Sequence, residues 1–310
     1  MFPRFLPALL CGLLLSFPIA AATPAVVTTI KPLQLIAAAV LEDIADPEVL
    51  LPPAASPHNY ALRPSDRRQL ADADRVYWVG PDLERFLERL LANQENARRV
   101  DQTPGLTLHY FGGPGEHEHE HGHGHEHDAH HDHEHAPGTL DAHIWLSITN
   151  ARYIARWMAE DLAQLYPEYQ PRLLHNAEQF AQRLDQMEEQ LQRRLRPLAG
   201  KPYFVFHDAY GYFEESLGVQ RRGVFTLSTE IQPGARHLHS LRQKLTEAGP
   251  SCVFREPQFP AERVMTLSNG LPVRIAVLDP LGIDIVAGPE GYEQLLLTLG
   301  NELAGCLEQL

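Results

Sequence analysis

The feature that most constrains the fold is a long amphipathic segment in the middle of the chain, Glu168–Arg196. Its apolar residues recur every three or four positions, as on one face of an α-helix; they are Leu173, Ala177, Phe180, Leu184, Met187, Leu191 and Leu195. At 1.5 Å per residue such a helix is about 44 Å long, which is long enough to run along two domains. Because Pro197 and Gly200 end the pattern, we predict a rigid connecting helix and not a coiled coil.

Short apolar strands alternate with helical segments on both sides of this helix. The predicted strands are Ala25–Ile30, Val49–Leu51, Val76–Val79, Tyr203–Phe206, Val224–Thr226, Cys252–Phe254 and Arg274–Leu278. Helices are predicted at Leu33–Leu41, at Arg67–Ala73 with Ser65-Asp66 as its cap, at Asp82–Asn93 and from Ser147 to Tyr166. This alternation predicts an α/β fold of two βα lobes with mainly parallel sheets. We divide the chain into an N-terminal lobe (23–165), the connecting helix (166–197) and a C-terminal lobe (198–310).

The first 22 residues have the order of a secretory signal peptide. Arg4 precedes an apolar run, Ala8–Phe17, and small residues follow at Ala20-Ala21-Ala22, where cleavage is expected. The alternative is a membrane anchor, but the run is shorter than the roughly 20 residues that span a bilayer. Export predicts a periplasmic location, with no membrane insertion after cleavage.

Two cysteines lie outside that segment, Cys252 and Cys306. An even number of cysteines in an exported protein predicts a disulfide, and two buried free thiols are the alternative.

One segment cannot contribute to a core. Glu116–His135 contains ten histidines and seven acidic residues in twenty positions, with no apolar residue larger than Ala129. Such a composition is typical of a disordered loop, and its imidazoles are auxiliary metal ligands in our prediction. These are His117, His119, His121, His123, His125, His127, His130, His131, His133 and His135. The formal net charge of −14 argues against nucleic acid as a partner.

Three other histidines lie at positions where a site is expected. His207 ends the apolar strand Tyr203–Phe206, His58 lies in a loop after a strand, and His143 lies in the segment Asp141–Leu146. Ligands of an open α/β sheet bind at the carboxyl ends of its strands, so convergence is plausible. Each histidine taken alone is equally consistent with an ordinary hydrogen-bonded side chain.

Acidic residues near strand ends are candidates for the remaining roles. Asp279 follows the strand Arg274–Leu278 and offers a fourth oxygen ligand, although an Asp before Pro also starts turns. Glu230 and Asp208 are expected to support the ligands without binding the metal themselves.

Several short motifs together resemble one family. They are Pro57–Ser65, Val79-Gly80-Pro81, Asp141–Leu146, Phe206–Tyr210 and Leu278–Gly282. The chain is similar in these motifs to the zinc/manganese-type (cluster A-I) periplasmic substrate-binding proteins of ABC transporters. The resemblance covers nearly all of the chain after residue 22 and implies two lobes joined by one long helix, with metal between them.

The resemblance also implies that His58, His143 and His207 are the metal ligands. Some zinc-type members have Glu immediately before the first ligand, where this chain has Pro57. The fourth ligand is therefore Asp279, water or a histidine of the segment Glu116–His135. Three imidazoles and one oxygen suit Zn²⁺, whereas Mn²⁺ prefers more oxygen ligands. The implied partner is a membrane permease with its cytoplasmic ATPase, and the protein is expected to be a monomer.

Four other functions compete with zinc uptake. A metal-binding adhesin or a periplasmic zinc buffer would use the same fold, and a manganese-specific homologue would use a similar site. A zinc hydrolase needs an open coordination position and a base. Because no HExxH motif is present, we expect a binding protein and no enzymatic activity.

Overall fold

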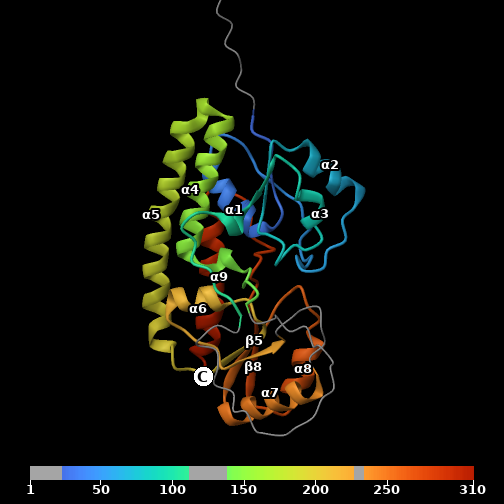
Figure 1. Ribbon diagram of the computed structural model, residues 1–310. Helices are drawn as coiled ribbons and strands as arrows, with labels where there is room; N and C mark the ends of the chain where they lie inside the picture. Colours follow the sequence, from blue (N-terminus) through green and yellow to red (C-terminus); the bar gives the residue numbers. More distant parts are fainter. Residues whose placement is uncertain (1–22, 112–137, 227–233) are drawn as a thin grey trace, which may run out of the picture.

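The structure is a computed structural model that describes residues 23–111, 138–226 and 234–310. These residues form two lobes, each built on a four-stranded parallel sheet, and one long helix runs beside both of them (Figure 1). The predicted α/β fold with two parallel sheets and a connecting helix is confirmed. Residues 1–22, which carry the predicted signal peptide, lie outside the described residues.

The sheet of the first lobe has the strand order β2-β1-β3-β4. Its strands are β1 (Val26–Thr28), β2 (Glu48–Val49), β3 (Arg75–Trp78) and β4 (Ala97–Arg99). Val27 is opposite Val76, and β1 and β3 are buried along their whole length. The helices of this lobe are α1 (Lys31–Val40), α2 (Pro64–Asp72), α3 (Glu88–Leu91) and α4 (Ile148–Leu165). Because α1 packs against both β1 and α4, it is buried on nearly every side.

The sheet of the second lobe has the strand order β6-β5-β7-β8. Its strands are β5 (Tyr203–His207), β6 (Gly223–Thr226), β7 (Ser251–Arg255) and β8 (Val273–Val277). Val205 is opposite Phe254 in the two central strands. The helices are α6 (Gly211–Leu217), α7 (Ala235–Ala248), α8 (Glu262–Ser268) and α9 (Gly291–Leu307). All four predicted strands of this lobe are present, with ends shifted by at most one residue.

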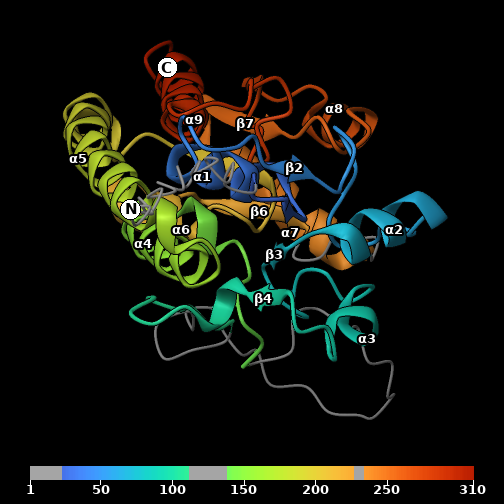
Figure 2. The same cartoon turned by 90° about the horizontal axis from the view of Figure 1, so that it is seen from above.

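The long helix α5 (Gln170–Leu195) has 26 residues and is therefore about 39 Å long. All seven residues of its predicted apolar stripe are buried. The helix is not isolated, because it packs against α4, α1 and α9. Figure 2 shows α4, α5 and α6 together on one side of the molecule, with α2 on the opposite side. Since α9 of the second lobe also packs against α1 of the first, one hydrophobic core continues through both lobes.

Two helices of the first lobe differ from the prediction. The segment predicted as one helix at Asp82–Asn93 contains only the single turn α3, preceded by i→i−3 turns such as Leu87 N–H to Glu84 O at 2.8 Å. The physical reason is that the Glu84 carboxylate accepts a hydrogen bond from Gly80 N–H at 3.1 Å and another from the Thr29 hydroxyl. These bonds hold Glu84 against the sheet.

Helix α2 begins earlier than predicted. Its N-cap is Arg63, with Pro64 as its first residue, whereas the sequence indicated Ser65-Asp66 as the cap. Proline is favoured at the first helical position because its missing N–H would be unsatisfied there. Asp66 still stabilises the helix start, because its carboxylate accepts a hydrogen bond from Arg63 N–H at 2.8 Å.

The strand β4 and the helices α6 to α9 have no counterpart among the elements predicted from the sequence. Within the described residues, no helix combines the length and the apolar character needed to cross a membrane.

A disulfide joins Cys252 of β7 to Cys306 of α9, which confirms the pairing predicted from the cysteine count. The bridge closes a loop with a sequence separation of 54 residues. It attaches the helix that contacts both lobes to the central part of the second sheet.

We expect the double variant Cys252→Ala/Cys306→Ala to lose roughly 3–4 kcal/mol of unfolding free energy, because the reduced unfolded chain gains loop entropy. Denaturant titration measures this loss. Reduction of the unmodified protein should shift its midpoint in the same direction, and the same reductant should leave the double variant unchanged. Equal midpoints for the oxidised protein and the double variant would contradict the expectation.

Candidate metal centre

His207 is placed by the second sheet. It is the last residue of β5, whose five residues are all buried, and only 4% of His207 is exposed. The apolar residues before it form the centre of a parallel sheet, so the imidazole lies at the carboxyl edge of that sheet.

His143 is placed by a short stretch that precedes α4. It directly precedes a 3-10 turn, Ile144–Leu146, and only 2% of the residue is exposed. The Asp141 carboxylate accepts the His143 main-chain N–H at 3.1 Å and lies 2.7 Å from the ring nitrogen Nδ1. A carboxylate that binds Nδ1 of a histidine fixes the orientation of the ring and raises the basicity of Nε2.

His58 lies in the loop between β2 and α2 and is partly exposed. The loop contains Pro52, Pro53 and Pro57, which restrict its backbone. His58 N–H is also within 3.4 Å of Ser56 Oγ. Of the three histidines, His58 is thus the one on a loop and nearest to solvent.

The structure brings these three histidines together from three different elements. One candidate ligand atom from each of them lies within 4.8 Å of the others. The ring centroids of His143 and His207 are 4.8 Å apart, and that of His58 lies 5.6 Å and 5.5 Å from them. In a tetrahedral zinc site two nitrogens are about 3.3 Å apart, so the histidine nitrogens need to approach one another by at most about 1.5 Å.

Glu256 is a residue of this centre that the sequence analysis missed. It is 2% exposed and follows β7, and both of its carboxylate oxygens lie 3.1 Å from Nδ1 of His207. The other ring nitrogen of His207, Nε2, is buried and has no hydrogen-bond partner among the described residues. A signal was present, because Glu256 directly follows the central strand β7, just as His207 ends the central strand β5.

The two buried carboxylates define the electrostatics of the centre. Burial raises the pKa of Asp141 to about 6, although the His143 N–H and Arg221 oppose the rise. For His207, burial alone lowers the pKa, but the carboxylates of Glu256, Asp208 and Asp141 together outweigh burial and raise it. Two carboxylates behind three imidazoles favour a divalent cation, whose charge they balance.

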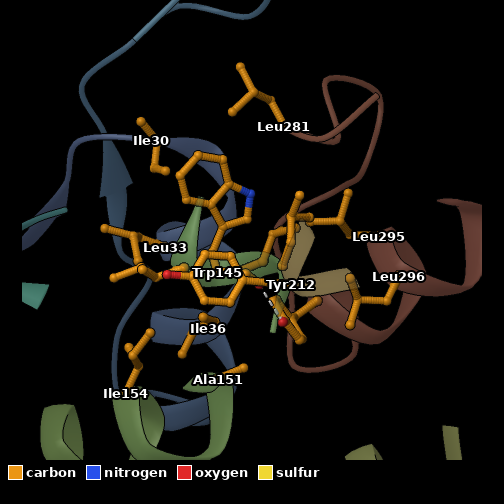
Figure 3. Close-up of a cluster of buried hydrophobic side chains, with 14 of the residues drawn as sticks. Ile30, Leu33, Ile36, Trp145, Ala151, Ile154, Tyr212, Leu281, Leu295 and Leu296 are labelled. Carbon is orange, nitrogen blue, oxygen red and sulfur yellow. Dashed lines mark hydrogen bonds between the residues drawn. The ribbon is translucent and has the colours of Figure 1, made fainter. Parts of the chain in front are cut away.

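The walls around the histidines are mainly apolar. Figure 3 shows Trp145 among side chains of α1, α4 and α9, with Leu281 above it. The indole N–H of Trp145 donates to Pro280 O at 2.9 Å, and Tyr292 OH donates to Trp145 O at 2.5 Å. The cavity beside the histidines is lined by Pro57, Trp145, Phe259, Pro280 and Leu281, together with Ser56, Gln258 and Glu256.

Asp279 is not brought into this cluster. Its carboxylate accepts hydrogen bonds from the N–H groups of Leu281 and Ile283, at 3.1 and 2.6 Å, and from the Gln258 amide at 2.8 Å. These contacts are those of an Asp that stabilises the turn after β8, which was the alternative interpretation. The histidine cluster with ligand spacing contains His58, His143 and His207 alone among the described residues.

Of the remaining predicted site residues, Asp208 lies beside His207 and raises the pKa of its imidazole. Asp208 forms a buried ion pair with Arg221, which also contacts Glu214. Glu230 lies outside the described residues, as do the ten histidines of Glu116–His135.

Two α/β lobes with a cluster of three histidines between them define a class of two-lobe protein able to hold a metal ion. The chain matches the protein family described as "Zinc-uptake complex component A periplasmic" over residues 26–306. It belongs to this family.

Individual relatives agree with that assignment. The chain is 42% identical to the "High-affinity zinc uptake system protein ZnuA" of Yersinia pestis over 309 residues, which cover 96% of this chain and 95% of that protein. It is 36% identical to the protein of the same name from Brucella suis, with 92% of each chain covered. A solved structure described as "Crystal structure of ZnuA" shares the fold, with a TM-score of 0.74 and 23% identity over 92% of this chain and all of that one.

Proposed function

We propose that the protein captures Zn²⁺ in the periplasm and delivers it to the membrane permease of an ABC transporter for high-affinity zinc uptake. Family membership supports the zinc-uptake role and the periplasmic location. The observation that carries the proposal is the convergence of His58, His143 and His207 from three separate elements to within ligand distance of one another.

In this proposal the three imidazoles bind the ion and a water molecule occupies the fourth position. Water is favoured over Asp279 because the hydrogen bonds of that carboxylate hold it in its turn. Asp141 and Glu256 orient two of the ligands through Nδ1. Three nitrogen ligands and one water suit Zn²⁺, whereas Mn²⁺ prefers more oxygen ligands.

The same arrangement supports binding and release over hydrolysis. A zinc hydrolase needs a base positioned to act on the metal-bound water. Glu256 is the acidic residue that lines the cavity, and its two oxygens face His207 Nδ1. A carboxylate held in this way serves to orient the ligand. The permease and its ATPase are the partners that this function requires, with the protein as a monomeric carrier.

The test is growth of a bacterial strain that lacks its own zinc-binding uptake protein but retains the permease, under zinc chelation. We expect the full chain to restore growth and His143→Ala to fail, with equal amounts of each protein in the periplasm. His175→Ala is the matched control, because His175 is an exposed residue of α5. Failure of the full chain to restore growth, or full restoration by His143→Ala, would refute the proposal.

A further inference from the structure

Tyr212 lies in the first turn of α6, five residues after His207, and is 1% exposed. Its hydroxyl donates a hydrogen bond to the Asp141 carbonyl oxygen at 2.9 Å and accepts one from the His109 main-chain N–H, also at 2.9 Å. One side chain of the second lobe therefore holds two segments that belong to the first. Figure 3 shows Tyr212 in the same cluster as Trp145.

The two segments that Tyr212 joins are paired with each other. Asp141 N–H donates to His109 O at 2.9 Å, and an isolated antiparallel bridge joins Tyr110 to Leu140. The His109 ring stacks on the Tyr212 ring, with centroids 4.1 Å apart and an interplanar angle of 5°. Glu215, also on α6, lies 2.7 Å from His109 Nε2 and holds the imidazole in that stack.

The contacts continue from Asp141 to the metal centre. The Asp141 carboxylate contacts both Nδ1 and the main-chain N–H of His143. A displacement of the Asp141 backbone therefore moves the group that sets the direction of the His143 ring. Because α6 follows directly after β5 and His207, the Tyr212 hydroxyl fixes the distance between the segments that carry His207 and His143.

We propose that Tyr212 is a positioning residue of the zinc site, an inference that rests on the proposed function. Its hydroxyl holds the segment of His143 at the correct distance from His207. Without the hydroxyl, the buried Asp141 carbonyl loses its donor, and the cost of an unsatisfied buried acceptor is relieved by movement of the backbone. Metal affinity depends on the hydrogen bonds that orient the ligands, and loss of such a bond weakens the affinity by about 10–100-fold. Burial raises the pKa of Tyr212, so the hydroxyl stays protonated and remains a donor at all physiological pH values.

The test compares Tyr212→Phe with the unmodified protein. We expect zinc affinity, measured by competition with a chelator, to fall about tenfold. We also expect a change in the visible absorption bands of bound Co²⁺, which report the geometry of the ligands. A residue that merely stabilised the fold would lower the melting temperature and leave the cobalt spectrum as it was.

Two further variants separate the hydroxyl from other effects. Tyr166→Phe removes a hydroxyl that contacts Asp74, a residue at the amino end of β3 and therefore away from the metal centre; zinc affinity and the cobalt spectrum should not change. His109→Ala removes the stacked ring but keeps the main-chain N–H, so the affinity should fall by less than about twofold.

Unchanged zinc affinity and an unchanged cobalt spectrum in Tyr212→Phe would overturn the inference. An equal loss in His109→Ala would overturn it as well, because the stack would then be responsible and the hydroxyl would not. These outcomes leave the proposed function intact as long as His143→Ala abolishes tight binding. Tight zinc binding that survives His143→Ala would refute the metal centre itself.

Discussion

His143→Ala is expected to weaken zinc binding by more than 100-fold. Loss of a residue that only orients a ligand by a hydrogen bond weakens binding by roughly 10–100-fold, and His143 is itself a ligand. Deletion of residues 116–135 should change the affinity of the tightest site by less than about threefold. The reason is preorganisation. His143 is held by Asp141 in a buried segment, and the hydrogen bonds that pair residues 109–111 with 138–141 lie outside the deletion. Ligands that are already held in place lose little entropy on binding.

Competition titrations against a chelator of known zinc affinity measure both variants. His175→Ala is again the control, because it removes an exposed imidazole from α5 without touching the metal centre. The unmodified chain should bind additional zinc equivalents weakly, and the deletion variant should bind one. Equal losses of affinity in His143→Ala and the deletion variant would show that the segment Glu116–His135 contributes to the tight site.

Zinc affinity is expected to fall steeply as the pH decreases from neutral. Each imidazole must be neutral to bind the ion, so protons compete for the same lone pairs. The free histidine pKa is about 6.5. The neighbouring carboxylates, with Glu256 foremost, raise the pKa of His207 despite its burial, so competition at His207 begins at a higher pH than for a free histidine. With three such ligands, the logarithm of the affinity approaches a slope of about three per pH unit below all three pKa values.

Glu256→Gln is the matched variant for this experiment. The amide keeps the shape of the side chain but removes the charge that favours protonated His207. We therefore expect weaker binding at high pH, by about 10–100-fold, together with a pH midpoint displaced to lower values. Isothermal titrations between pH 8 and pH 5 measure both changes. An affinity that stays constant down to about pH 5 would exclude a centre built from histidines.

The local pattern of the chain was sufficient for the connecting helix and for the strands other than β4, but it did not reveal the helices α6 to α9. The seven apolar residues of α5 repeat at helical spacing, and all seven are buried. The strand before His207 is continuously apolar, which predicted both its burial and the position of the histidine at its end. Helix α3 is the counterexample. It is shorter than predicted because the Glu84 carboxylate accepts hydrogen bonds from Gly80 N–H and from the hydroxyl of Thr29, which lies 55 positions away. No regular spacing of apolar residues encodes contacts of that kind.

Features with local causes could be predicted from the residues alone. They are the periodicity of α5, the buried strands, the cysteine pair and, through short motifs, the three histidines that converge. Which acidic groups face these histidines depends on long-range packing. Asp141 lies two residues from His143, but Glu256 reaches His207 across 49 positions and Tyr212 reaches Asp141 across 71. Asp279, beside a proline, follows its local tendency and holds a turn. The physical reason is that periodicity and turn preferences act within a few residues. The orientation of a ligand depends instead on buried polar groups that must find partners wherever packing places them.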